Sequence, residues 1–76
     1  MRWQFLRSDP LVCNGRVHIA GTRITARRAL EALALHADRA ELAEDFPELT
    51  EAVIREVLNF AALQLDDSEI DWPRAA

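Results

Sequence analysis

The chain is 76 residues long and half of its residues are hydrophobic, so it is expected to form one small domain with a buried core. Its single cysteine excludes a disulfide framework and zinc-finger spacing, and suits a reducing compartment. No apolar run approaches the ~18 residues of a membrane span, and no signal peptide is visible at the N-terminus. We therefore expect a cytoplasmic protein without a membrane segment.

The net charge of −4 is unevenly distributed. Residues 1–39 carry seven arginines against three acids, a net +4, whereas residues 40–76 carry two arginines against ten acids, a net −8. Such asymmetry indicates two surfaces that meet different partners. The alternative is that the charges only solvate the outer faces of helices.

Both glycines of the chain lie near its N-terminal end and favour β-structure there. Asn14-Gly15 is the dipeptide preferred by a type I′ turn, whose central residues both need a positive φ. We expect hairpin strands at 11–13 and 17–19 on either side of it, and a second sharp turn at Gly21. A phosphate-binding loop has four residues between its glycines, followed by Lys and then Ser or Thr. Here five residues separate Gly15 from Gly21, Thr22 follows, and the chain contains no lysine, so this loop is excluded.

Three helices are predicted after the hairpin, each beginning at a capping residue. Thr25 is a candidate N-cap of a helix through His36. Asp38 followed by Glu41 resembles a capping box, and Pro47 ends the short helix that it begins. The longest helix runs from Glu51 to about residue 65, with Thr50 as its N-cap.

The hydrophobic spacing predicts one buried face on each long helix. On the first helix this face consists of Ala26, Leu30, Leu33 and Ala34. On the last helix it consists of Val53, Ile54, Val57, Leu58, Ala61 and Leu65. Arg27 with Glu31, and Glu51 with Arg55, have the i,i+4 spacing of exposed ion pairs.

Tryptophans lie near both ends of the chain. Trp3 and Phe5 alternate with other residues, which predicts a short strand or an arm packed on the core. Residues 66–76 are acidic and carry two isolated apolar side chains, Ile70 and Trp72. We interpret 1–65 as the folded domain and 66–76 as a partner-binding tail. The alternative is that Trp72 folds back onto its own domain.

The pattern resembles a widespread small bacterial family, catalogued as domain of unknown function four-three-three, over roughly residues 8–62. The matching elements are Asp9-Pro10, Gly15-Arg16, Ile19, Gly21-Thr22-Arg23-Ile24, Asp45-Phe46-Pro47, Leu49-Thr50 and Phe60-Ala61. Val17 stands where the family usually has Pro, and Phe60 where Tyr is common. Periodicity alone predicts a β-hairpin followed by three helices. The resemblance adds a mainly α (α+β) fold in which those helices form a helix-turn-helix-like domain.

The resemblance also implies a function. Family members are often described as antitoxins encoded beside PIN-like ribonuclease toxins. We therefore expect the antitoxin of a type II toxin–antitoxin pair, which neutralises a PIN-like toxin and binds its own promoter DNA as a dimer. The alternative is a protein-interaction module without DNA binding, which the acidic balance favours.

The binding residues follow from charge and side-chain type. On the last helix, Glu51 and Glu56 would be repelled by phosphates, although Arg55 and Asn59 could read base edges. We therefore expect DNA to contact the hairpin and first helix through Arg16, Arg23, Arg27 and Arg28, with Arg7 and His18 as further candidates. The alternative is ordinary solvation of these arginines, with Arg23 buried against an acid. In the tail, the expected toxin-binding residues are Ile70, Trp72 and Arg74.

No catalytic or metal-binding constellation is complete. Cys13 and His18 are two groups at most, too few for a closed metal site. His36 near a helix C-terminus is explained by a favourable interaction with the helix dipole. We expect neither an enzyme nor a cofactor. The small size of the chain, with Phe60 and Leu63 outside the main apolar stripe, predicts a homodimer or a hetero-oligomer with the toxin.

Overall fold

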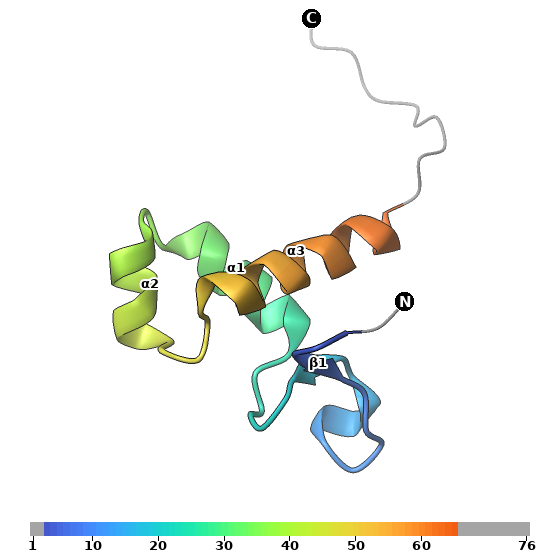
Figure 1. The fold of residues 1–76 in the computed structure, drawn as a ribbon. Coiled ribbons are helices and arrows are strands. Elements are labelled where there is room, and N and C mark those ends of the chain that lie inside the picture. The colour runs from blue at the N-terminus through green and yellow to red at the C-terminus, as the bar shows by residue number, and fades with distance from the viewer. Residues whose placement is uncertain (1–2, 66–76) are drawn as a thin grey trace, which may run out of the picture.

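The computed structural model describes residues 3–65 and consists of an N-terminal β-hairpin followed by three helices (Figure 1). The elements, in chain order, are β1 (Leu6–Arg7), a 3-10 turn (Cys13–Gly15), β2 (His18–Ile19), α1 (Ala26–Leu35), α2 (Arg39–Asp45) and α3 (Glu51–Gln64). The predicted fold class, mainly helical with a small antiparallel sheet, is confirmed. Within the part of the chain that the structure describes, no helix combines the length and apolar character needed to cross a membrane.

The strands of the hairpin differ from the predicted ones. β1 pairs antiparallel with β2, with Leu6 opposite Ile19 and Arg7 opposite His18. The second strand was predicted correctly. The first was not, because residues 11–13 lie in the connection between the strands rather than in the sheet.

Asp9 explains why residues 11–13 are not a strand. Its carboxylate accepts a hydrogen bond from the backbone N–H of Leu11 at 2.9 Å, and its carbonyl accepts one from Val12 at 2.9 Å. These bonds close a turn over residues 9–12 that contains Pro10, which is typical of an Asp that bonds the backbone two residues further on. Leu11 is consequently 92 % exposed instead of facing the core.

The predicted glycine turns are both present. Asn14 and Gly15 have φ angles of 56° and 79°, and the Arg16 N–H donates to the Cys13 carbonyl at 3.1 Å, as a type I′ turn requires. Cys13 also has a positive φ of 52°, an uncommon conformation for a non-glycine residue. Gly21 has a φ of 76° and closes the turn in which the Thr22 N–H donates to Ile19.

All three helices begin at the predicted caps. Each capping side chain accepts a hydrogen bond from the backbone N–H three residues further on: Thr25 from Arg28 at 3.0 Å, Asp38 from Glu41 at 2.8 Å, and Thr50 from Val53 at 3.3 Å. α1 ends one residue before His36, and α2 ends before Phe46-Pro47. The capping residues recognised in the sequence therefore predict the start of each helix correctly.

The core lies where α1, α3 and the hairpin meet, and α1 packs against α3 (Figure 1). The buried residues that form it are Leu6, Ile19, Ala29, Ala32, Leu42, Leu49, Val53, Ile54 and Val57. The fully buried members that α1 contributes to this core, Ala29 and Ala32, are both alanines. Val57 is fully buried, with no exposed side-chain surface.

The predicted helix faces need correction at their edges. On α1 the fully buried residues are Ala26, Ala29 and Ala32, while Leu30 and Leu33 are partly buried and Ala34 is exposed. On α3, Leu58 and Leu65 are 46 % and 75 % exposed, so the prediction that they face the core was wrong. The buried stripe of α3 is narrower than its hydrophobic spacing suggested, and an apolar edge is left on its outer side.

Candidate functional site

The four predicted DNA-binding residues, Arg16, Arg23, Arg27 and Arg28, are all exposed, and we call them the arginine surface. The backbone brings their segments together. The Ala26 N–H donates to the Val17 carbonyl at 2.9 Å, and the Cys13 thiol donates to the Arg23 carbonyl at 3.4 Å. The segment that follows the type I′ turn therefore lies beside the start of α1.

Few interactions neutralise the arginine surface. Arg27 is the most clearly paired, since its Nε lies 3.6 Å from Glu31, yet its side chain is 88 % exposed. Arg28 lies over the Phe46 ring, 5.5 Å from the ring centroid. Within residues 3–65, Arg16 and Arg23 form no ion pair, so the alternative that Arg23 is buried against an acid is wrong.

The start of α1 adds to the positive potential of this surface. Its first turn contains no acidic residue, and the side chain of its N-cap Thr25 accepts a hydrogen bond from the Arg28 N–H. The N-terminal end of a helix carries a partial positive charge and unpaired N–H groups, which attract phosphate oxygens. Arg27 and Arg28 lie in this same turn, so the helix dipole and the side-chain charges both attract anions.

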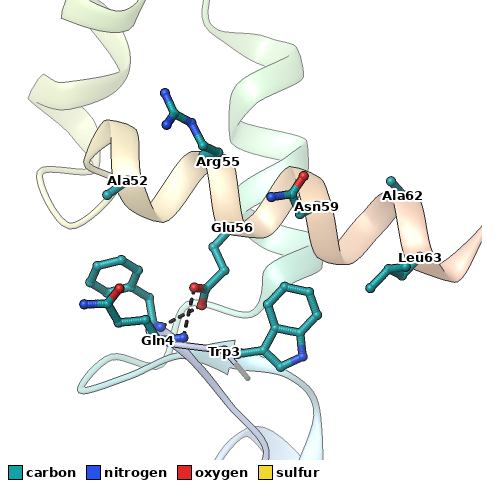
Figure 2. A pocket seen from close by; sticks show the side chains of 9 residues that line it. Trp3, Gln4, Ala52, Arg55, Glu56, Asn59, Ala62 and Leu63 are labelled. Atoms are coloured by element: carbon teal, nitrogen blue, oxygen red, sulfur yellow. Dashed lines mark hydrogen bonds between the residues drawn. The ribbon is translucent and has the colours of Figure 1, made fainter. Parts of the chain in front are cut away.

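A second feature was not expected from sequence: Glu56 of α3 holds the N-terminal arm, residues 3–5. Its carboxylate accepts hydrogen bonds from three backbone N–H groups, those of Gln4 at 2.9 Å, Phe5 at 2.6 Å and Leu6 at 2.9 Å (Figure 2). Three donors stabilise the ionised carboxylate and keep the arm beside α3. Nothing in the sequence distinguishes Glu56 from the solvent-exposed glutamates of a helix.

Arg7 binds backbone carbonyl groups of the same segment whose N–H groups bind Glu56. Its Nη1 donates to the carbonyls of Trp3 at 3.3 Å, Gln4 at 3.2 Å and Leu6 at 2.8 Å. Only two residues of the arm region form a sheet strand, and the backbone groups around them need other partners. One carboxylate and one guanidinium supply these partners, so Arg7 is a structural residue here.

The arm and α3 border an open groove of about 490 Å³ (Figure 2). Its lining residues are Trp3, Gln4, Phe5, Ala52, Arg55, Glu56, Asn59, Ala62 and Leu63. Trp3 is fixed by an edge-to-face contact with Phe60, with the ring centroids 5.6 Å apart. Phe60 is therefore partly buried against the core, whereas Leu63 is 57 % exposed; the dimer contact through these two residues stays a prediction.

Arg55 lines the groove and does not form the ion pair with Glu51 that the sequence predicted. Glu51 bonds Arg39 of α2 at 2.8 Å instead of Arg55, because the turn between α2 and α3 brings the starts of both helices together. The predicted Glu51–Arg55 pair was therefore wrong. Arg55 has no carboxylate within ion-pair distance among residues 3–65.

His36 joins the ends of α1 and α2. Its Nδ1 lies 2.7 Å from the Ala32 carbonyl and its Nε2 lies 2.8 Å from the Asp45 carboxylate. Both partners are acceptors, so the ring satisfies both only when both nitrogens carry a proton. The hydrogen bond to Asp45, followed by the one to Ala32, raises the pKa of His36 above its usual value. The contact with Ala32 agrees with the predicted helix-terminus role.

The remaining predicted residues are the candidate metal ligand His18 and three residues of the tail. Within the described residues no three His, Cys, Asp or Glu side chains come together as metal ligands. His18 is buried, and its Nδ1 lies 3.2 Å from the Arg16 carbonyl. The predicted toxin-binding residues Ile70, Trp72 and Arg74 lie outside the residues that the structure describes.

Together these observations define a small hairpin-and-three-helix domain, with an arginine surface beside the start of α1 and a groove along α3. The chain belongs to the family described as "Protein of unknown function (DUF433)", whose model matches residues 7–61. This confirms the resemblance found in the sequence. No curated protein and no solved structure matches the chain.

Proposed function

We propose that this chain is the antitoxin of a type II toxin–antitoxin pair. In this proposal it acts in the cytoplasm, neutralises a PIN-like ribonuclease, binds its own promoter DNA as a dimer, and has neither catalytic activity nor a cofactor of its own. Membership of the family supports it, because the resemblance to that family implies an antitoxin encoded beside a PIN-like ribonuclease. The observation that carries the DNA-binding part is the arginine surface, which is exposed and only weakly paired.

The chemistry of the arginine surface suits a phosphate backbone. Arginine side chains bind phosphate oxygens in a bidentate manner, and each contact releases counterions from DNA. The overall charge of −4 opposes DNA binding at long range. Because the acids are concentrated after residue 40, the N-terminal half still presents a local positive potential.

The α3 helix is less suited to enter the major groove, despite its helix-turn-helix-like position. The arm lies along one side of it, held by Glu56, and would obstruct an approaching duplex (Figure 2). Glu51 at the start of the helix pairs with Arg39, so this guanidinium is already bound to a carboxylate. Both features favour the arginine surface as the side that meets DNA.

The toxin-binding part of the proposal is assigned to residues 66–76. A PIN-like active site is expected to be a cluster of carboxylates, to which Arg74 would be attracted by bidentate pairing. Ile70 and Trp72 would supply apolar contacts, and a buried Trp commonly dominates such interfaces. In a co-purification assay with the nuclease, Trp72→Ala and Arg74→Glu should both lower the amount of complex recovered, and Asp67→Ala should lower it less.

The experiment that tests DNA binding is a gel-shift series across salt concentrations with the promoter fragment. The double variant Arg27→Ala, Arg28→Ala should bind more weakly, and the slope of log K against log salt should fall by about two, since each lost phosphate contact lowers it by about 0.9. Arg55→Ala is the matched control and should leave the slope unchanged. An equal slope for the double variant and the wild type would refute the assigned surface.

The second candidate function is a protein-interaction module without DNA binding. The segment from Val57 to Leu65 favours it, since it contains no charged residue and exposes Leu58, Leu63 and Leu65. Leu58 lies on α3 and Leu65 directly follows its end, so the two leucines offer apolar surface along one helix on which a second copy could pack isologously. Absence of any shift by the wild-type chain on its own promoter would favour this candidate over the first.

Dimerisation can be tested on that edge alone. Sedimentation of the wild-type chain at tens of micromolar should give a dimer, and Leu58→Glu should give a monomer because it places a charge on the apolar contact. Gln64→Glu is the matched control, as its side chain is exposed and polar already. A monomeric wild-type chain would refute the dimer.

A further inference from the structure

We propose that residues 66–76 of this chain dock, when no partner is bound, in the groove between the N-terminal arm and α3 of the same molecule. Ile70 and Trp72 would cover the apolar wall of the groove, and the acids around them would lie beside Arg55. The proposal concerns the isolated chain and does not depend on whether its partner is a nuclease.

The groove has the shape and chemistry of a peptide-binding site. Its volume of about 490 Å³ exceeds the space of one side chain and falls among typical binding pockets. Ala52 and Ala62 leave room along α3, while the Trp3 ring and the half-exposed Leu63 give apolar contact surface. The Trp3 ring is held in place by Phe60, so this surface is preformed.

The charges of the groove favour an acidic occupant. Arg55 lies at its rim and has no carboxylate partner among residues 3–65, since Glu51 is bonded to Arg39. The carboxylate of Glu56 is the groove's own negative charge, and three backbone N–H groups already bind it. A further acid beside Arg55 is therefore attracted by an unpaired cation.

The remaining chain supplies such an occupant at the right distance. Residues 66–71 contain four acids, Asp66, Asp67, Glu69 and Asp71, interrupted by Ile70 and followed by Trp72. α3 ends at Gln64, and the ten residues from there back to Arg55 span about 15 Å of helix axis. Six extended residues cover about 20 Å, so the segment reaches Arg55 after one reversal of direction.

The docked arrangement would couple partner binding to the groove. Trp72 would be shielded by the arm in the isolated chain and transferred to the partner on binding. The groove would then be exposed again, so the partner would compete with an intramolecular contact whose effective concentration is set by a short connection. Arg55→Glu, which empties the groove without changing residues 66–76, should consequently bind the partner more tightly. Trp72→Ala removes a contact to the groove and a contact to the partner, so it should not.

The docking can be measured by paramagnetic broadening in the full chain. The single native thiol is removed as Cys13→Ser, which keeps a donor toward the Arg23 carbonyl, and Ala76→Cys receives a nitroxide. In a ¹⁵N-labelled sample, we expect loss of the amide signals of Asn59 and Ala62, with recovery on reduction of the nitroxide. The exposed amides of α2, such as Ala43, should keep their intensity.

Two substitutions in the labelled chain test the assigned contacts. Arg55→Glu reverses the charge at the rim, and Trp72→Ala removes the aromatic anchor, so each should restore the signals of Asn59 and Ala62. Arg27→Glu makes the same charge change outside the groove and should leave the broadening in place. Restoration by Arg27→Glu as well would show a non-specific attraction and overturn the proposal.

A mixed sample decides which molecule the segment binds. Isotope-labelled chains without the nitroxide are combined with unlabelled chains that carry it. Intramolecular docking predicts full intensity for Asn59 and Ala62 in this mixture. Broadening in the mixture would place the segment in a second copy's groove. Absence of broadening in the chain that carries both the isotope and the nitroxide would show an empty groove. Either result overturns the proposal.

Discussion

Replacing Glu56 by alanine should destabilise the domain more than any other change to an acidic side chain of α3. Glu56 is half-buried and accepts three hydrogen bonds from the arm and the start of β1, of which those from Phe5 and Leu6 are partly buried. The third, from Gln4, is exposed, so its N–H can bond water after the substitution. A partly buried N–H without a partner costs about 1–2 kcal/mol, toward the lower end of the range for buried groups.

Two such N–H groups lower the free energy of unfolding of Glu56→Ala by about 2–4 kcal/mol relative to the wild type. In a domain of this size that loss lowers Tm by roughly 10–30 °C, at about 4–8 °C for each kcal/mol. Glu56→Gln should cost less, because its amide oxygen still accepts while its NH₂ group faces other donors. Thermal and urea unfolding followed by circular dichroism measure both variants.

A local measurement separates the assigned contact from a general weakening of α3. Hydrogen exchange at the Phe5 and Leu6 amides should accelerate in Glu56→Ala more than exchange in the middle of α1. Glu31→Ala is the matched control, since it removes an exposed helix glutamate whose ion pair with Arg27 is worth at most about 0.5 kcal/mol. If Glu56→Ala unfolds at the same urea concentration as this control, the hydrogen bonds to the arm do not stabilise the fold and the reasoning is refuted.

Three further predictions concern the fold itself. Because the folded-state pKa of His36 is raised, its contact with Asp45 should stabilise the fold fully below the unfolded pKa of about 6.5 and lose that contribution as pH rises through the folded value. The urea midpoints of wild type and Asp45→Asn should therefore differ at pH 5.5 and converge at pH 9. Val57→Ala should cost about 2–3 kcal/mol by emptying a fully buried site, whereas Leu58→Ala, at a side chain 46 % exposed, should cost less than about 1 kcal/mol; equal losses in urea unfolding would contradict the buried face of α3. Gly21→Ala should cost about 1 kcal/mol through its φ of 76° alone, since nothing lies within 4 Å of the added methyl group, and Gly21→Asn should cost less; indistinguishable Tm values for the three chains would refute this.

The sequence by itself determined the helix starts and the glycine turns. Thr25, Asp38 and Thr50 cap their helices through hydrogen bonds to a backbone N–H three residues away, and Asn14-Gly15 forms its turn within four residues. These interactions are local, so neighbouring residue types are enough to specify them. The same holds for the exposure of the arginine surface, because arginine is rarely buried without a partner.

The choice of strand partner and of ion-pair partner was decided by the tertiary structure. Residues 11–13 have the composition of a strand, yet the Asp9 turn places them in the connection and leaves Leu6 to pair with Ile19. Glu51 forms its ion pair with Arg39 and not with Arg55 as predicted, because the turn at Pro47 brings α2 beside α3. In both cases the interaction predicted from local spacing is replaced by another contact, which the spacing of residues did not reveal.

Only the tertiary structure could reveal the groove and the role of Glu56. Its hydrogen bonds to the arm join residues about fifty positions apart, and sequence spacing says nothing about which side chains meet over such a separation. In sequence, Glu56 is one of several helix glutamates and Trp3 is one aromatic near a chain end. Packing of α3 against the hairpin brings them together, since burying Leu6 and Val57 in one core leaves the arm's backbone next to a carboxylate that can bind it.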